Sequence, residues 1–282
     1  MKKIFFRFVL FLNLTNSAVA QIIGGLPPLK PIEQKQVSPQ SNFSAPFKPY
    51  SSFENLGFTA PKMYVKQFRT LTKKDCLPFS KKNNVDGLFC MYVIHTLAKE
   101  IDSAFPYALK AAELGNPIAQ YEIINLYKKG LGIPKNQEAS IYWNKKCVES
   151  KVASCEVNLG WNYMDSKSQL PIDYSQAMQL NLLGFEHGHA EGASNVGMLY
   201  EMGWGVPVDY DLAADWYKKA IRGSGSSGQA ETRLANLYVL GLGVKKDHVE
   251  AKRLYKYVQD EPLFHIEYRK AARFELDSWS KN

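Results

Sequence analysis

The side chains with the most distinctive chemistry in this sequence are four cysteines, Cys76, Cys90, Cys147 and Cys155. Thiolates can bind zinc, but neither neighbouring pair has the two-residue spacing of a zinc site and no histidine lies at ligand spacing, so we predict no metal. In an oxidising compartment an even number of cysteines favours disulfides. Four cysteines allow three pairings, and the count alone does not choose between them.

No other set of residues predicts catalysis or a cofactor. The sequence has no nucleophile-elbow, zinc-protease, phosphate-loop or dinucleotide-binding motif. The glycine-rich stretch 223–228 lacks the lysine that a phosphate loop needs, and we interpret it as a lengthened turn. The acidic residues are scattered, with no pair that suggests acid–base catalysis. We therefore predict that the protein is not an enzyme and binds no cofactor.

The first twenty residues have the pattern of a secretory signal peptide. Lys2, Lys3 and Arg7 precede a short apolar stretch that ends in a small-residue cleavage site at Ala20. The stretch is too short to cross a membrane, which takes about 20 apolar residues. The next residue is Gln21, which argues against a lipid anchor. We expect an exported protein without a membrane span, in a bacterial periplasm or outside the cell.

The positive charge is concentrated after a polar arm. Residues 21–60 are rich in Pro, Ser and Gln and predict a flexible arm. The formal net charge of the chain is +8, and residues 61–85 alone carry seven bases and one acid. We favour a solvated face for this basic segment, and the alternative is contact with an anionic surface or partner. Because the remaining body is slightly acidic, we predict no nucleic-acid partner.

The body of the chain repeats itself about every 37 residues. Two independent sets of residues recur 36 to 38 residues apart, which are Tyr127, Tyr163, Tyr200 and Tyr238, and Ala139, Ala177, Ala213 and Ala251. Each unit has the pattern of two helices joined by a turn. Glycine pairs such as Gly130 and Gly132 end the first helix, and the second repeat, which lacks them, is predicted to have a different turn. The N-caps predicted for the second helix are Asp173, Asp209 and Asp247.

Residues 188–220 show most fully the pattern L-G-x-x-Y, G-x-G, Asp and A-x-x-W, and over about 106–259 the sequence resembles the Sel-1-like repeat (SLR) branch of the tetratricopeptide superfamily. The resemblance implies an all-α fold, an α/α solenoid that forms a right-handed superhelix. It implies four repeats over 116–260, after a basic segment and a degenerate first repeat over 61–115. His187 and His189 could form a two-histidine metal site, but His189 occupies an ordinary turn position of the repeat, and we favour that interpretation.

The cysteine spacing around 147–160 resembles that of the cysteine-rich exported bacterial SLR proteins. That resemblance implies a Cys147–Cys155 bridge from one repeat to the next, and a Cys76–Cys90 bridge around a longer insert. Closing loops of this size stabilises the fold by about 2.5–3 kcal/mol each in the chain-entropy model.

The C-terminal segment 261–282 is predicted to form a capping helix, because a terminal repeat needs a cap with a polar outer face. We expect its apolar face to hold Leu263, Ile266, Ala271, Phe274 and Leu276.

The first helices of such hairpins line a concave face that usually holds a partner. We predict that a protein or peptide binds there through Glu122, Asn125, Asn158, Trp161, Asn195, Met198, Trp204, Arg233 and Asn236. Trp161, Met198 and Trp204 are larger than the pattern requires. Packing between repeats is our favoured interpretation of these three, and exposed binding anchors are the alternative.

Our leading hypothesis is a non-enzymatic protein–protein interaction module in the periplasm. The resemblance suggests a specific form, an immunity protein that neutralises a periplasm-acting secreted toxin. One alternative is an SLR protein that binds or hydrolyses peptidoglycan or β-lactams, and another is a secreted factor that binds a host protein. The sequence leaves the oligomeric state open.

Overall fold

The computed structural model describes residues 48, 50, 59–223 and 228–279. The predicted signal segment 1–20 lies outside the described residues, and so does the predicted arm 21–60, apart from Lys48, Tyr50 and the first two residues of the first described helix. Lys48 and Tyr50 contact that helix, because Gln67 Nε2 donates to Lys48 O at 2.8 Å and the Tyr50 ring lies 5.4 Å from that of Tyr64.

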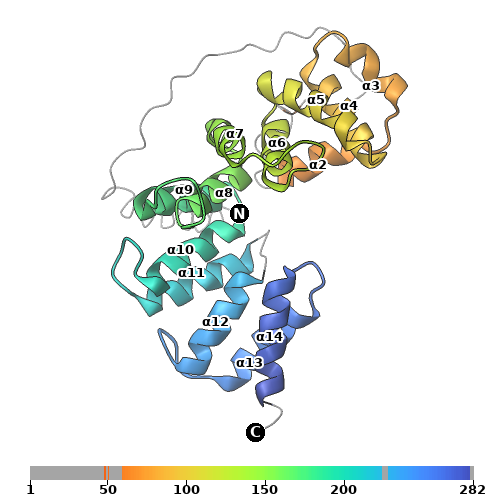
Figure 1. Ribbon diagram of the computed structural model, residues 1–282. Coiled ribbons are helices and arrows are strands. Elements are labelled where there is room, and N and C mark those ends of the chain that lie inside the picture. Colours follow the sequence, from red (N-terminus) through yellow and green to blue (C-terminus); the bar gives the residue numbers. More distant parts are fainter. Residues whose placement is uncertain (1–47, 49, 51–58, 224–227, 280–282) are drawn as a thin grey trace, which may run out of the picture.

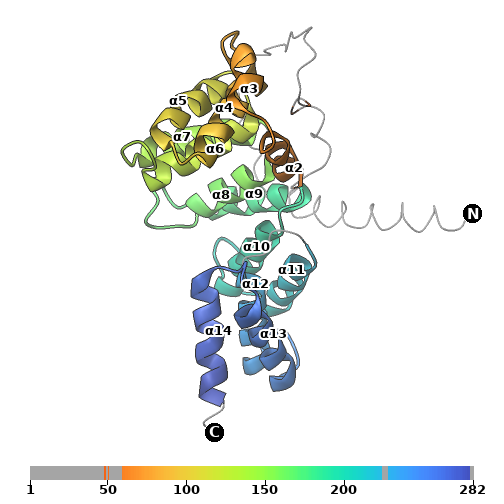
Figure 2. The same cartoon turned by 90° about the vertical axis from the view of Figure 1, so that its right-hand side faces the viewer.

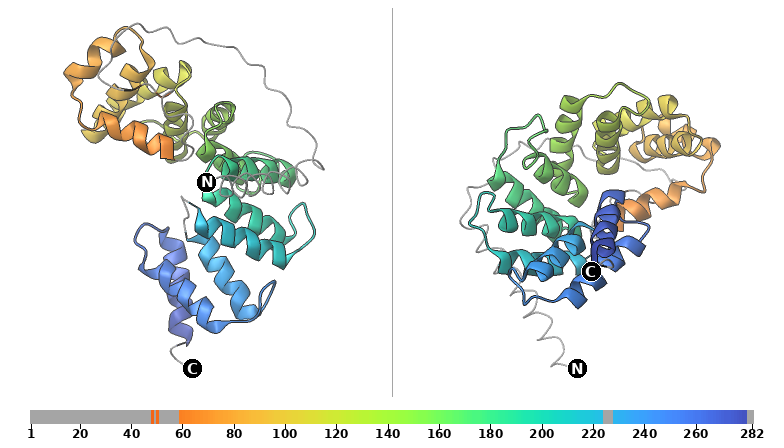
Figure 3. Two further views of the ribbon diagram at one scale, coloured as in Figure 1. Left: turned by 180° about the vertical axis from the view of Figure 1, so that it is seen from behind. Right: turned by 60° about the horizontal axis from the view of Figure 1, so that its bottom comes forward.

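The described residues form thirteen helices and no strand. The first helix packs on the third, and from the second onward each helix packs on the next along the chain. Helix pairs stack into an elongated, curved solenoid (Figures 1 and 3), which confirms the predicted all-α solenoid. The helices are α2 (Thr59–Phe68), α3 (Lys73–Ser80), α4 (Val85–Leu97), α5 (Ile101–Glu113), α6 (Pro117–Lys129), α7 (Gln137–Glu149), α8 (Ala153–Asn162), α9 (Tyr174–Glu186), α10 (Ala190–Met202), α11 (Tyr210–Arg222), α12 (Gln229–Leu240), α13 (His248–Asp260) and α14 (Ile266–Trp279).

Five helix pairs make up the repeats, and we call α4, α6, α8, α10 and α12 the first helices and α5, α7, α9, α11 and α13 the second helices. Side-chain caps begin four of the second helices. Asp173, Asp209 and Asp247 accept backbone N–H groups of the first turn, as predicted, and Asn136 does the same for α7. These caps set the register of each second helix against its first helix.

In the repeat formed by α6 and α7, this register corrects the residue that we predicted to pack in the core. Four residues after its cap Asp209, α11 places the fully buried Ala213 against the core, whereas four residues after Asn136 α7 places Ser140 there. Ser140 therefore takes the position that the sequence pattern assigned to Ala139. Its hydroxyl donates to the backbone oxygen of Ile124 in α6 at 3.1 Å, which satisfies a polar group inside the core.

Small residues on the first helices allow the second helices to approach closely. A Cβ atom at Gly197 would lie only 2.6 Å from the ring of Tyr217 on α11. In the repeat of α6 and α7 the larger side chain lies on the first helix instead, since Ile124 stands at the Gly197 position and Asn144 at the Tyr217 position. The total volume between the two helices is thus roughly conserved, which close-packed interiors require.

The two glycines of each G-x-G turn have different roles. The first, such as Gly203, ends the helix in the left-handed conformation. The second contacts the preceding repeat: a Cβ at Gly205 would lie 2.6 Å from Tyr174, and one at Gly243 would overlap the backbone of Tyr210. The second repeat has no such turn, as predicted, and its connection from Tyr163 to Asp173 is longer than those of the other repeats.

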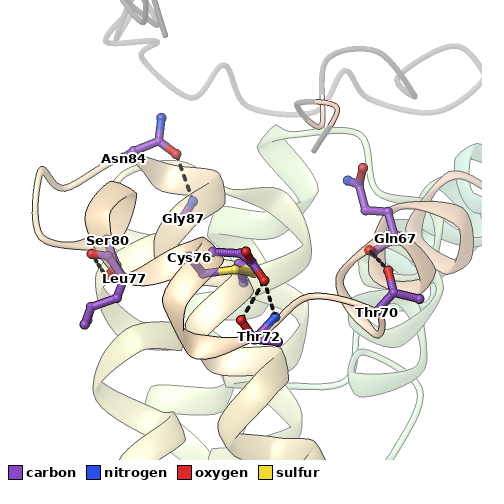
Figure 4. Close-up of a disulfide and its surroundings, with 10 residues drawn as sticks. Gln67, Thr70, Thr72, Cys76, Leu77, Ser80, Asn84 and Gly87 are labelled. Atoms are coloured by element: carbon purple, nitrogen blue, oxygen red, sulfur yellow. Dashed lines mark hydrogen bonds between the residues drawn. A yellow bond between two sulfur atoms is a disulfide. The ribbon is translucent and has the colours of Figure 1, made fainter. Parts of the chain in front are cut away.

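Both disulfides join the cysteines as the resemblance implied. Cys76 pairs with Cys90 and ties α3 to α4, while Cys147 pairs with Cys155 and ties α7 to α8. Figure 4 shows the first of these bridges beneath α3, whose N-terminus is capped through Thr72. The bridges hold together neighbouring helices where the repeats depart most from their pattern.

The core has two main parts. One lies among α2 to α6, and the other extends from the end of α8 to α14. A small cluster of Ile124, Cys147, Val152 and Cys155 lies between them. The Asn144 amide also spans this junction: in the orientation that satisfies both of its ends, it donates to Cys155 O and accepts from Leu159 N, each at 3.0 Å.

The C-terminal helix α14 packs on α13 and α12 as a terminal element, but through a different face from the one we predicted. Ala272 is fully buried, and Tyr268, Leu276 and Trp279 pack against the core beside it. Leu263, Ile266, Ala271 and Phe274 are exposed instead, with Phe274 at 72%. The small side chain of Ala272 lets α14 lie close to its neighbours, which Phe274 would prevent.

Candidate interaction surface

The solenoid curves so that helices distant in the sequence face one another (Figure 1). We define its inner face by Tyr121 and Glu122 of α6, Glu191 of α10, Arg233 of α12 and Tyr268 of α14. The first helices position four of these side chains, and the terminal helix supplies the fifth.

Electrostatic coupling shows that these side chains share one space. Burial raises the pKa of Tyr121, and the charges of Glu122 and Glu191 raise it further. Burial also raises the pKa of Tyr268, where the charge of Arg233 opposes the increase and that of Glu191 adds to it. The curve brings α10, α12 and α14 into contact, and α6 faces them through the charge that Glu191 exerts on Tyr121.

Hydrogen bonds between successive first helices fix the charged side chains. Tyr92 of α4 donates to Glu122 Oε2 at 2.8 Å, and Arg233 Nη1 donates to Glu201 Oε2 of α10 at 3.1 Å. Burial raises the pKa of the Glu122 carboxyl, against the effect of its bond from Tyr92. A carboxylate and a guanidinium are thus held in place on the inner face before any partner arrives.

Glu191 is the exception, because its carboxylate has no hydrogen bond or ion pair with any residue that the structure describes. It lies half-buried in the first turn of α10. Burial raises the pKa of Glu191, and the positive charges of His265 and Lys128 act in the opposite direction from outside ion-pair distance. The inner face therefore offers a partly desolvated acceptor to a donor from a partner.

Several of the predicted partner-binding residues lie at the surface. Trp161 is 37% exposed, and Asn236 is exposed and accepts a hydrogen bond from Tyr255. The half-buried ones are Glu122, Asn125, Asn158 and Arg233. Contact of these residues with a partner stays a prediction.

Three other predicted residues pack between helices. Asn195 is 1% exposed and donates to Asn181 Oδ1 at 2.8 Å, and Met198 is 3% exposed beneath the amide of Gln229. The indole of Trp204 stacks on Tyr174 of the preceding repeat at 5.5 Å. Asn195 and Met198 are therefore core residues in this structure, and we remove them from the candidate surface.

Sequence reasoning missed Tyr121, Glu191 and Tyr268. Tyr121 and Glu191 lie on first helices but outside the positions that vary most clearly between repeats, and Tyr268 lies in the terminal helix. Nothing in the spacing of these residues indicates that they meet, because the curvature that joins them accumulates over several repeats. Their aromatic and acidic character was the one available signal.

The two histidines near the end of α9 have separate structural roles. His187 Nδ1 lies 2.7 Å from Glu156 Oε2. His189 caps α10, and burial, with a smaller contribution from Lys62, lowers its pKa to about 4. Across the described residues no group of three or more His, Cys, Asp or Glu is arranged to hold a metal ion.

In the same part of the chain, no helix has the length and apolar character needed to cross a bilayer.

Comparison with known proteins identifies the repeats. The Sel1 repeat family model matches residues 98–116, 117–146, 153–189, 190–224 and 228–257. A solved Sel1 repeat protein from Oxalobacter formigenes is 24% identical, with a TM-score of 0.57 over 73% of this chain and 81% of its own. A protective antigen of uropathogenic Escherichia coli strains, displaying an SLR fold, is 19% identical, with a TM-score of 0.58 over 74% of this chain and 48% of that longer one. These likenesses show the fold.

Proposed function

Because this chain belongs to the Sel1 repeat family, whose repeats generally mediate protein–protein interactions, we propose that it is a non-enzymatic module that binds another protein on its inner face. The observation that carries this proposal is the convergence of Tyr121, Glu122, Glu191, Arg233 and Tyr268 from four helices. Tyrosine and arginine are among the residues that dominate the binding energy of protein interfaces, and this surface holds both types.

The unpaired Glu191 indicates the chemistry of the partner. A half-buried carboxylate gains most from a charged donor, since charge-assisted hydrogen bonds are about twice as strong as neutral ones. A lysine or arginine side chain of the partner would supply that donor, with the rings of Tyr121 and Tyr268 nearby.

We propose that this binding takes place in the periplasm after export. The two disulfides support an oxidising compartment, where such bonds persist. A specific form of the proposal is an immunity protein that neutralises a toxin acting in that compartment. A toxin with a basic segment that contacts the inner face would fit the unpaired Glu191.

Affinity purification from the periplasm tests the proposal with matched variants. We expect Glu191→Lys and Trp161→Ala to lose a partner that the unchanged protein retains. Tyr142→Ala, which alters a 55% exposed ring on α7, should retain it. Thermal unfolding of each variant establishes that the fold is intact. A partner that the Glu191→Lys and Trp161→Ala variants both hold as tightly as the unchanged protein would rule out this surface.

A further inference from the structure

The N-terminal end of the solenoid carries a dense basic surface that the proposed function does not use. All the bases of residues 61–85 are exposed, and they are Lys62, Lys66, Arg69, Lys73, Lys74, Lys81 and Lys82. The one acid in this segment, Asp75, accepts from Thr72 N and Thr72 Oγ1, each at 2.7 Å, and so caps α3. We call these seven bases the basic end.

The bases on α2 form a stripe. Lys62, Lys66 and Arg69 follow one another at intervals of four and three residues, which places them on one face of the helix. The opposite face holds Tyr64 and Phe68, both fully buried. The burial of these two rings forces the basic stripe outward.

The bases on and beside α3 extend this surface. Lys73 and Lys74 open the helix, and Lys81 and Lys82 follow its last residue. Positive charges in the first turn oppose the helix dipole and are unfavourable for folding. For Lys73, an ion pair with Glu100 at 3.1 Å offsets this unfavourable interaction with the dipole. The placement of Lys74 brings no benefit to the helix that carries it.

Strong local contacts hold the basic end in one geometry. The Cys76–Cys90 bridge fixes α3 on α4 (Figure 4). Tyr64 of α2 donates to Asp86 of α4 and accepts from Asn116 Nδ2 at 3.0 Å. The bases therefore project from a cross-linked frame. Figure 2 shows α3 at the far end of the molecule from α14, with α2 extending from α3 toward α9 and α10.

We propose that the basic end binds the surface of an anionic lipid bilayer. Six of its seven bases are lysines, which act as point charges, whereas specific recognition of a protein carboxylate favours the fork of arginine. The described residues of the segment expose no large aromatic anchor of the kind that protein interfaces use, and Met63, 48% exposed beside the stripe, adds apolar contact. An array of mobile phosphate headgroups matches a surface of separate point charges. Each base close to the bilayer strengthens binding about fivefold.

The test measures partitioning of the processed protein, recovered from the periplasm, onto vesicles. We expect binding to vesicles of phosphatidylglycerol and phosphatidylcholine, little binding to phosphatidylcholine alone, and release in 1 M NaCl, where the Debye length is about 3 Å. Reversal of four bases (Lys66→Glu, Arg69→Glu, Lys74→Glu and Lys81→Glu) should weaken partitioning at least about 100-fold.

A matched control separates this surface from net charge. Reversal of four exposed lysines elsewhere (Lys135→Glu, Lys145→Glu, Lys245→Glu and Lys256→Glu) changes the net charge equally and should weaken partitioning less than about tenfold. Equal loss in both variants, or no binding to the anionic vesicles, overturns the proposal. So does binding of polyglutamate or DNA by the basic end when the vesicles do not bind. Glu191→Lys should leave vesicle binding intact, so the two proposals can fail separately.

Discussion

At the scale of single residues, the Glu156–His187 pair makes the stability of the fold depend on pH. The Glu156 side chain is 2% exposed, and His187 is its one charged partner among the described residues. Removing a cation from a buried carboxylate is strongly destabilising. The hydrogen bond that His187 donates to Glu156 raises the pKa of His187 above its ordinary value of 6.5, with burial and Lys151 acting in the opposite direction and Glu186 adding to the increase.

We therefore expect the pair to stabilise the fold most below pH 6.5 and to lose this effect as pH rises through the raised pKa of His187. Urea unfolding between pH 5.5 and 8.5 measures it as the difference in unfolding free energy between the unchanged protein and His187→Gln. That difference should shrink toward alkaline pH. A difference that grows with pH would contradict this account.

At the scale of elements, the G-x-G turn joins one repeat to the one before it. Gly243 has φ +61° and lies against the backbone of Tyr210, whereas Gly115 has φ +89° and nothing within 4 Å of a Cβ built there. A left-handed alanine costs about 1–2 kcal/mol at either site. The overlap adds roughly 2 kcal/mol at Gly243 alone.

Gly243→Ala should therefore lower the free energy of unfolding by roughly 3–4 kcal/mol, and Gly115→Ala by no more than about 2. Chemical denaturation of the two variants provides the measurement. Equal losses would mean that the turn does not depend on close contact with Tyr210.

The terminal helix allows a similar comparison of two faces. Ala272→Glu places a carboxylate in a fully buried position of α14, and we expect it to destabilise the protein by about 3 kcal/mol. Phe274→Glu alters an exposed position and should change stability by about 0.5 kcal/mol or less. Thermal melts distinguish the two outcomes, and the reverse order would restore the face expected from the sequence.

Helices, caps and turns were predictable from the sequence because each depends on a few nearby residues. Asp209 and Gly203 identify a helix start and a helix end by their own chemistry. The core position Ser140 was assigned to Ala139 because alanine, not serine, recurs in the other repeats. The choice between two apolar stripes on α14 depended on the shape of α13, which the spacing of residues does not contain.

At the scale of the whole molecule, the candidate site was less predictable than the fold. Met198 and Trp161 occupy corresponding positions of two repeats, yet one is buried and the other exposed, because neighbouring repeats cover them differently. Glu191 and Tyr121 come together only through the curvature of the whole solenoid. A site built by accumulated rotation leaves no local pattern.

The two-part core predicts that the halves unfold separately. Leu199→Ala creates a cavity at a fully buried position and should cost about 2–5 kcal/mol. Since repeats contact only their neighbours, we expect amide exchange to accelerate in α10 to α13 while α4 and α5 stay protected. Hydrogen-exchange mass spectrometry resolves these segments. Equal acceleration in α4 and α5 would show that the solenoid unfolds as one unit.

The positions of the two disulfides also give the molecule unequal mechanical ends. Under tension applied at its termini, the bridges withhold the segments between Cys76 and Cys90 and between Cys147 and Cys155, with separations of 14 and 8 residues. At about 3.5 Å per residue, these segments amount to roughly 50 and 30 Å of chain that cannot extend. After Cys155 no covalent link resists extension. Pulling should therefore extend the C-terminal repeats at a lower force than the disulfide-linked N-terminal repeats.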